Sequence, residues 1–373
     1  MAPPSHADQQ APATSGLEPQ GSPVHPRQLG VHEWDRYALV IDARSPHEYN
    51  EDHVPGAVNL PVVDDEQYAE VGIRHKTDKH GAYLIGVEYS LQNIARHIKP
   101  LISRYTPQDR FLVYCFRGGK RSRLWADNLR TIGFEVDVIS GGWKNYRSWV
   151  RAGLETLPSR FSYRVLCGPT GCGKTRLLHA LERQGAQVLD LESLASHRGS
   201  LIGALPGEPQ PTQKMFDSLL LERMRTLDPA RPVWLEAESK KIGNVQLPLA
   251  LFEAMHRSPV IHVDAPMAER VLLWREDYAH FATDPVGMVR RLEPLKPLVG
   301  KETLGLWHEL AAARRVDELF ESVMARHYDP CYQRSTRRNY GEQEEQQALH
   351  LTSLGEQGLA DAAEQLLKGI AEV

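Results

Sequence analysis

The chain has 373 residues, 41% of them hydrophobic and 25% charged, which is a globular composition and more length than one ordinary hydrophobic core uses. Its formal net charge is −4, but residues 341–373 contribute −6 and the rest is near +2, so a strongly basic domain is absent and only a local basic patch is left for a nucleic-acid partner. No stretch approaches the roughly 18 consecutive apolar residues of a membrane span, and the N-terminus lacks the order of a signal peptide. We therefore expect a cytoplasmic protein without a membrane partner.

The first part of the chain predicts a disordered tail followed by an α/β domain. Residues 1–28 are rich in Pro, Gln, Ala and Ser and lack the large apolar side chains that would offset the entropy of ordering. A first domain is predicted over residues 29–155, with strand-like runs at 38–41, 111–114 and 136–139 and helix-like segments at 91–102 and 124–132. This alternation predicts a parallel sheet covered by helices.

A second α/β domain is predicted over residues 156–335. Its strand-like runs are 163–166, 187–189, 232–235 and 260–263, and beyond residue 266 the pattern is mostly helical, with an amphipathic stretch at 302–326. Residues 336–373 are predicted to form an acidic polar tail that is partly helical. Seven acidic residues and one lysine lie within 341–373.

Cys115 directly follows a strand-like run and precedes a helical segment. A strand-to-helix turn supplies converging backbone N–H groups and the positive end of a helix dipole, which favour a thiolate and a docked anion. Gly118 and Gly119 allow the backbone to bend around one point, and three basic side chains add positive charge: Arg117, Lys120 and Arg121. We predict a reactive cysteine; the alternative is an inert, buried one.

Residues 168–175 match G-x-x-x-x-G-K-[ST] after a predicted strand and before a predicted helix. This phosphate-binding loop predicts a phosphate or diphosphate site formed by Gly168, Gly171, Gly173, Lys174 and Thr175. Cys167 and Cys172 are expected to pack within the loop rather than react. An NTPase also needs an acidic residue after a later strand, and each candidate could instead be a strand end or a helix cap: Asp190, Glu192, Glu236 and Glu238.

The first domain resembles the rhodanese family. The resemblance rests on the Cys115 loop and on residues 42–49, 53–59 and 141–143. In rhodaneses the loop cysteine carries sulfur or selenium. Here Arg121 lies six positions after the cysteine, one more than is usual in sulfurtransferase loops, which suggests a larger anion such as selenophosphate. Four residues are interpreted as a structural network behind the loop: Asp42, Arg44, Glu48 and His53.

Together, the two loops resemble the bacterial tRNA 2-selenouridine synthase family over residues 31–335. Further matching segments are 197–200, 213–216, 236–243 and 328–332. The resemblance implies geranylation of a wobble 2-thiouridine on sulfur by geranyl diphosphate, followed by replacement of the geranylthio group with selenium from selenophosphate. It makes Cys115 the selenium-carrying residue, with Arg117 and Arg121 holding the anion.

Several assignments follow as hypotheses. We place geranyl diphosphate at the phosphate-binding loop, where a nucleotide would fit the same residues. The partner is tRNA carrying 2-thiouridine, the chain is expected to act as a monomer, no metal ligands are assigned, and Mg²⁺ is left open as an additional ion. The aromatic residues of the helical part are expected in the core: Trp274, Tyr278, Phe281, Tyr328 and Tyr332.

Two alternatives remain at this point. One is another enzyme, either a nucleotide-dependent rhodanese-type sulfurtransferase or a C-x5-R phosphatase. The other is a nucleotide-regulated binding module in which the cysteine loop only senses phosphate. Turnover of thiosulfate or an aryl phosphate would reveal the first.

Overall fold

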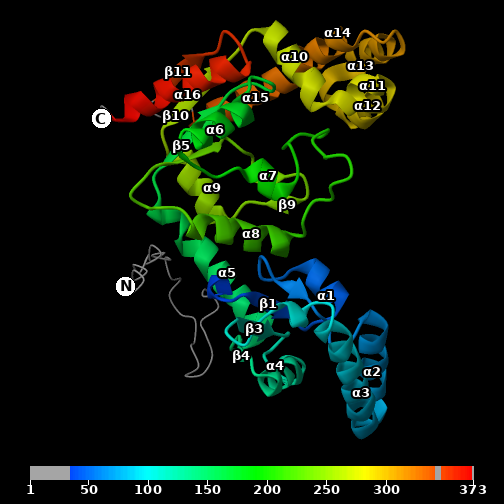
Figure 1. Ribbon diagram of the computed structural model, residues 1–373. Helices are drawn as coiled ribbons and strands as arrows, with labels where there is room; N and C mark the ends of the chain where they lie inside the picture. The colour runs from blue at the N-terminus through cyan, green and yellow to red at the C-terminus, as the bar shows by residue number, and fades with distance from the viewer. Residues whose placement is uncertain (1–33, 341–345, 372–373) are drawn as a thin grey trace, which may run out of the picture. The chain divides into compact units, whose positions relative to one another are not determined.

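The computed structural model describes residues 34–340 and 346–371 (Figure 1). The chain divides into two compact units, the first made of residues 1–153 with 221–226 and the second of residues 154–220 with 227–373. The first division lies close to the domain boundary predicted at residue 155. The predicted disordered tail, residues 1–28, lies outside the described residues. Within the described ranges, no helix is long and apolar enough to cross a membrane.

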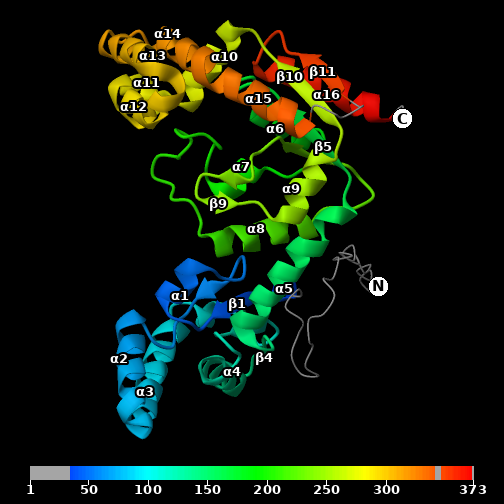
Figure 2. The same cartoon turned by 180° about the vertical axis from the view of Figure 1, so that it is seen from behind.

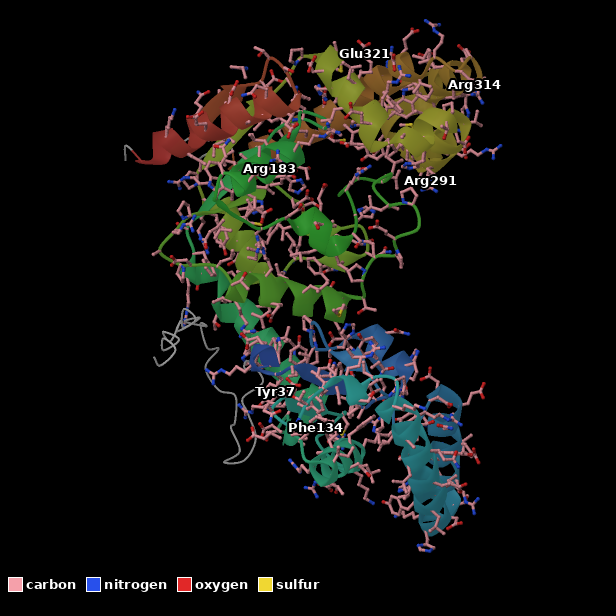
Figure 3. All side chains as sticks on the ribbon, in the orientation of Figure 1. Tyr37, Phe134, Arg183, Arg291, Arg314 and Glu321 are labelled. Carbon is pink, nitrogen blue, oxygen red and sulfur yellow. The ribbon has the colours of Figure 1, made fainter. Side chains whose placement is uncertain are left out.

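The first unit contains a parallel sheet of strand order β2-β1-β3-β4. Its central strands are buried, since Ile41 and Val113 face each other in register with no exposed surface. Phe111 packs against Phe134, which Figure 3 labels, with 4.6 Å between the tilted rings' centroids. The strands are β1 (Leu39–Asp42), β2 (Val58–Asn59), β3 (Arg110–Tyr114) and β4 (Glu135–Val138).

The helices of this unit are α1 (Pro46–Glu51), α2 (Asp65–Thr77), α3 (Lys79–Ile98), α4 (Lys120–Ile132) and α5 (Gly142–Thr156). Figure 1 shows α2 and α3 as an antiparallel pair. The side chain of Asp78 accepts a hydrogen bond from the Gly81 N–H at 2.8 Å and so caps α3. The helix predicted at 91–102 therefore begins earlier, at Lys79, because Asp78 caps it. It also ends earlier, at Ile98.

The second unit contains a larger parallel sheet of order β11-β10-β5-β7-β6. Its strands are β5 (Tyr163–Cys167), β6 (Gln187–Val188), β7 (Val233–Glu236), β10 (Val260–Asp264) and β11 (Gln346–His350). A short antiparallel pair, β8 (Lys241–Ile242) with β9 (Val245–Gln246), lies outside this sheet. The helices that precede β10 are α6 (Lys174–Arg183), α7 (Leu191–Ala195), α8 (Gln213–Arg225) and α9 (Leu249–His256).

The C-terminal segment differs from the predicted acidic tail. β11 pairs in parallel with β10 at the sheet edge, and α16 (Glu356–Ala371) contacts α6. Leu359, Ala363 and Leu366 of α16 belong to the core of the second unit, and Figure 2 shows this helix from behind. Residue 335 is therefore not a domain boundary, and Glu356, Asp361 and Glu364 of α16 lie on the exposed face of an amphipathic helix.

The part between the last two sheet strands is helical, as predicted: α10 (Met267–Asp277), α11 (Ala279–Thr283), α12 (Pro285–Leu292), α13 (Lys296–Ala312), α14 (Val316–Val323) and α15 (Asp329–Tyr340). The stretch predicted at 302–326 is not one helix. Arg314, labelled in Figure 3, has φ 56° and separates α13 from α14. Trp274, Tyr278 and Phe281 are buried here, as expected. The α/β class of both domains is confirmed.

Candidate functional site

The first candidate site surrounds Cys115, which directly follows β3 and is 3% exposed. The Gly119 N–H donates to the Cys115 sulfur at 3.3 Å, and the Ser122 hydroxyl lies 3.3 Å from the same atom. Gly119 is the N-cap of α4, so the sulfur also faces the positive end of that helix. The sulfur therefore lies at the strand-to-helix turn predicted from the sequence, next to a backbone N–H and a hydroxyl group.

Two glycines bring a second turn against this loop. Gly142 has φ 60°, and a Cβ there would lie 2.2 Å from the Cys115 carbonyl oxygen and 2.5 Å from the Gly118 nitrogen. A Cβ on Gly118, whose φ is 66°, would lie 2.9 Å from the Ile139 carbonyl oxygen. The cysteine loop therefore depends on backbone packing that a larger residue would prevent.

The basic side chains of the loop contact other groups. Arg121 forms a two-point ion pair with Glu48, at 2.5 and 3.2 Å, and interacts electrostatically with Cys115. Burial lowers the pKa of Arg121, but the hydrogen bond and charge of Glu48, together with Cys115 and Tyr68, more than offset burial, so the net pKa is raised. The Lys120 ammonium lies 3.4 Å from the Tyr83 ring centroid, whereas Arg117 is exposed above Phe116. Arg121 is thus the best placed to meet an anion.

The residues interpreted as a supporting network have distinct roles. Asp42 and Arg44 form a buried ion pair at 2.6 Å, and Arg44 also donates to the Asp52 carbonyl at 2.6 Å. The His53 imidazole is bonded to the Tyr49 carbonyl at 2.9 Å. Glu48, in contrast, orients Arg121 directly. Sequence reasoning missed this pairing, because 73 positions separate the two residues.

The second candidate site is the phosphate-binding loop between β5 and α6. Gly171 and Gly173 have φ of 78° and 84°. A Cβ on Gly171 would lie 3.0 Å from the Trp274 ring, and one on Gly168 would lie 2.3 Å from the Val263 carbonyl oxygen. The glycines therefore serve both the loop conformation and its close packing on β10 and α10.

Lys174 begins α6 and folds back over the loop. Its ammonium donates to the Gly168 carbonyl at 2.9 Å and to the Pro169 carbonyl at 3.4 Å. Burial lowers the pKa of Lys174, but Cys172, Glu236 and other neighbours more than offset this, so the pKa is raised and the side chain stays charged. The lysine is thus a cation held at the position where a phosphate oxygen would bind.

A buried ion pair supports the loop from the helical part of the unit. Arg270 donates to the Thr170 carbonyl at 3.0 and 2.8 Å and pairs with Asp329 at 2.6 Å.

Burial raises the pKa of Cys167 to about 12 and also raises that of Cys172, so both remain thiols. They pack within the loop as expected.

Three glutamates lie beside the loop: Glu192 on α7, Glu236 at the end of β7, and Glu238 just beyond it. Burial, followed by the charge of Glu236, raises the pKa of both Glu192 and Glu238. The carboxyl groups of Glu192 and Glu238 both lie beside Gly199, where an added Cβ would be 3.0 Å from Glu192 Oε1 and 3.1 Å from Glu238 Oε2, while Glu236 Oε1 is buried without a hydrogen-bond partner. Asp190 is a helix cap, since it accepts from the Ser193 N–H at 2.8 Å.

Lys174, Asp190 and the three glutamates line one cavity of about 680 Å³. His197 also lines it, and its Nδ1 has no hydrogen-bond partner although the residue is only 8% exposed. Aromatic residues form another part of the cavity wall: Trp274, Tyr278 and Tyr328. No group of three or more His, Cys, Asp or Glu residues suited to a metal ion occurs among residues 34–340 and 346–371.

Comparisons with known proteins agree with this two-part organisation. A rhodanese-like domain profile matches residues 28–148, and the profile described as the tRNA 2-selenouridine synthase AAA domain matches residues 161–288. The first match contains the Cys115 loop and the second contains the Lys174 loop.

Curated relatives named tRNA 2-selenouridine synthase extend across both units. The protein from Nitrosomonas europaea is 36% identical over 69% of this chain and 67% of its own length. Those from Nitrosomonas eutropha and Hydrogenovibrio crunogenus are 35% and 36% identical, covering 68% and 65% of this chain and 65% and 68% of their own lengths. The matches thus span about two thirds of each relative. This chain belongs to the tRNA 2-selenouridine synthase family.

Proposed function

We propose that this chain converts the wobble 2-thiouridine of tRNA to 2-selenouridine in two steps. The proposal is supported by one observation above all, namely that this member of the family carries an intact cysteine loop in its first unit and, in its second unit, an intact phosphate-binding loop that lines a cavity. The two loops offer two different chemistries, and the proposed reaction needs both.

The first step is alkylation of the thione sulfur by geranyl diphosphate. Sulfur attacks C1 of the geranyl group, the C1–O bond breaks, and diphosphate leaves. The phosphate-binding loop suits the departing anion, because Lys174 and the N–H groups at the start of α6 stabilise negative charge as it develops. Mg²⁺ would add positive charge at the diphosphate, but no residue is assigned to it.

The second step is exchange at C2 of the base. Alkylation converts a poor leaving group into a good one, so a selenium nucleophile adds at C2 and geranylthiol departs. Selenophosphate is the proposed source: water breaks its Se–P bond, phosphate leaves, and selenide-level selenium held at Cys115, the proposed selenium-carrying residue, attacks C2. Arg121 is the proposed anion-binding side chain, held ready by Glu48, and Gly119 supplies a backbone donor.

The test is reconstitution with purified protein and tRNA that carries 2-thiouridine at the wobble position. Nucleosides would be quantified by mass spectrometry after incubation with geranyl diphosphate alone, and then after addition of selenophosphate. We expect S-geranyl-2-thiouridine first and 2-selenouridine second. Turnover of thiosulfate or an aryl phosphate without any change to the tRNA would instead favour the sulfurtransferase or phosphatase alternative.

A further inference from the structure

S-alkylation of 2-thiouridine also requires the loss of a proton, for which the phosphate-binding loop supplies no acceptor. The base carries a proton on N3, and when sulfur gains a carbon substituent, C2 becomes doubly bonded to N3. The N3 proton must therefore leave. A group that accepts it during the attack lowers the barrier, typically by 10²- to 10⁴-fold in rate. This inference rests on the proposed function.

Glu192 and Glu238 are suitable acceptors by position. Both line the same cavity as Lys174, so an acceptor there would share the space with a diphosphate on the loop. Both carboxyl groups lie beside Gly199, and the charge of Glu238 helps to raise the pKa of Glu192, so one of the two can hold a proton while the other accepts one. Glu236 is less suited, because Lys174 is the charged group that acts on it most strongly.

The backbone at Gly199 passes close to the carboxyl groups of this pair. Gly199 has φ 64°, and a Cβ there would lie 3.0 Å from Glu192 Oε1 and 3.1 Å from Glu238 Oε2. His197, two residues earlier, faces the cavity with an Nδ1 that has no hydrogen-bond partner and a pKa lowered by burial. A buried polar atom left without a partner is costly, which indicates that a polar ligand binds beside the pair.

The charged surroundings suit a base that works near neutral pH. Burial raises the pKa of Glu238 to about 8, into the range where a carboxylate accepts a proton effectively. The groups that face the pair from the surrounding elements are Lys174 on α6, Asp190 before α7, Glu236 on β7 and Tyr278 after α10. Because the pair is coupled, its titration belongs to both residues together.

We propose that the Glu192–Glu238 pair is the general base that removes the N3 proton while the thione sulfur attacks geranyl diphosphate. The step balances without any other reagent. The C2=S bond becomes single as its π pair forms the sulfur–carbon bond to C1, and the C1–O bond breaks with its pair going to diphosphate. The N3–H electrons form the new C2–N3 double bond, and the proton passes to the carboxylate.

The experiment measures single-turnover geranylation by Glu192→Gln, Glu238→Gln and the double variant, with mass spectrometry as the readout. Each amide keeps the shape of the side chain and removes a buried charge, so folding is expected to be retained. Glu253→Gln, an exposed site on α9, is the matched control. We expect the double variant to be slower by on the order of 10²-fold, with an unchanged dissociation constant for geranyl diphosphate in calorimetry.

The pH profile separates catalysis from structure. In the native protein the rate should rise with pH as the pair ionises, and this rise should be lost in the double variant. A native rate and profile in all three variants would overturn the proposal, as would weakened geranyl diphosphate binding that accounts for the whole loss. Absence of geranylation by the native protein would instead remove the proposed function, and this role with it.

Discussion

The Lys174 side chain forms its hydrogen bonds within its own loop, so a bound phosphate would have to replace these contacts. The ammonium donates to the Gly168 and Pro169 carbonyl groups, which are neutral acceptors. A diphosphate oxygen is charged and forms a stronger bond with the same donor. Ligand binding should therefore exchange two weak contacts for stronger ones, with little movement of the lysine.

Replacing Lys174 with alanine should weaken diphosphate binding. A hydrogen bond to a charged group contributes about 1.5–3 kcal/mol, so the dissociation constant should rise about 10- to 100-fold. Calorimetric titrations with inorganic pyrophosphate and with geranyl diphosphate measure this. Arg183→Ala, an exposed change at the far end of the same helix, is the control. Unchanged affinity for geranyl diphosphate would remove that ligand from this site.

The glutamate cluster predicts a specific pH dependence of stability. The pKa values of Glu192 and Glu238 are raised in the native state, so above the ordinary carboxyl pKa the native protein holds more protons than the unfolded chain. Its free energy of unfolding should then fall as pH rises from 6 to 9. Glu192→Gln should make this fall smaller, as followed by thermal unfolding without ligand. An equally steep fall in the variant would show that other groups cause it.

At the residue scale, the motifs were predictable and their partners were not. Cys115 and Lys174 lie on strand-to-helix turns because an apolar run, glycines and a helical segment follow one another in the sequence. The pairing of Arg121 with Glu48, and of Glu192 with Glu238, depends on which strands are neighbours. Of the four acidic candidates near the phosphate-binding loop, Asp190 caps helix α7.

At the scale of elements, the Gly141–Gly142 turn is as important to the first site as the cysteine loop itself. Gly142→Ala would place a carbon 2.2 Å from the Cys115 carbonyl oxygen at a φ of 60°. We expect a loss of about 1–3 kcal/mol in stability and of most selenation, with geranylation retained.

Gly72→Ala is the matched control for this change. Gly72 lies within α2 with nothing within 4 Å of its added Cβ, so alanine should stabilise the helix by up to about 1 kcal/mol. Both variants would be compared by chemical denaturation and by the two-step assay. Native selenation by Gly142→Ala would show that the turn does not hold the loop.

The C-terminal helix α16 is predicted to be required for the stability of the second unit. Leu366 is 3% exposed within its core, so Leu366→Ala should cost about 2–5 kcal/mol of unfolding free energy. Leu298→Ala, at a side chain that is 70% exposed, should change it by less than about 0.5 kcal/mol. Urea unfolding measures both. Equal, small effects would mean that α16 is a dispensable tail after all.

Element types were easier to predict than the edge of the second sheet. Runs such as Val260–Asp264 are apolar because both faces of a parallel strand are covered. β11 contains Gln346, Gln347 and His350, so its five residues carry too few apolar side chains to suggest a strand. Its pairing with β10 and the burial of Leu349 in the same core as α16 define it, and both are tertiary effects.

At the scale of the whole molecule, the described part of each compact unit contains a glycine-containing strand-to-helix loop at the end of a parallel strand, where we propose that an anion binds. In the first unit the loop follows β3, and in the second it follows β5. This placement obeys the general rule that parallel sheets bind ligands at the carboxyl ends of their strands. The proposed reaction assigns alkylation to one loop and selenium transfer to the other, so the steps should be separable by mutation.

The most direct measurement follows both modified nucleosides in two variants. Lys174→Ala is predicted to fail on 2-thiouridine but to convert tRNA that already carries the geranyl group at the native rate. Cys115→Ser is predicted to accumulate S-geranyl-2-thiouridine and to form no 2-selenouridine. Native conversion of 2-thiouridine by Lys174→Ala, or formation of 2-selenouridine by Cys115→Ser, would contradict the assignment of the two steps to the two loops.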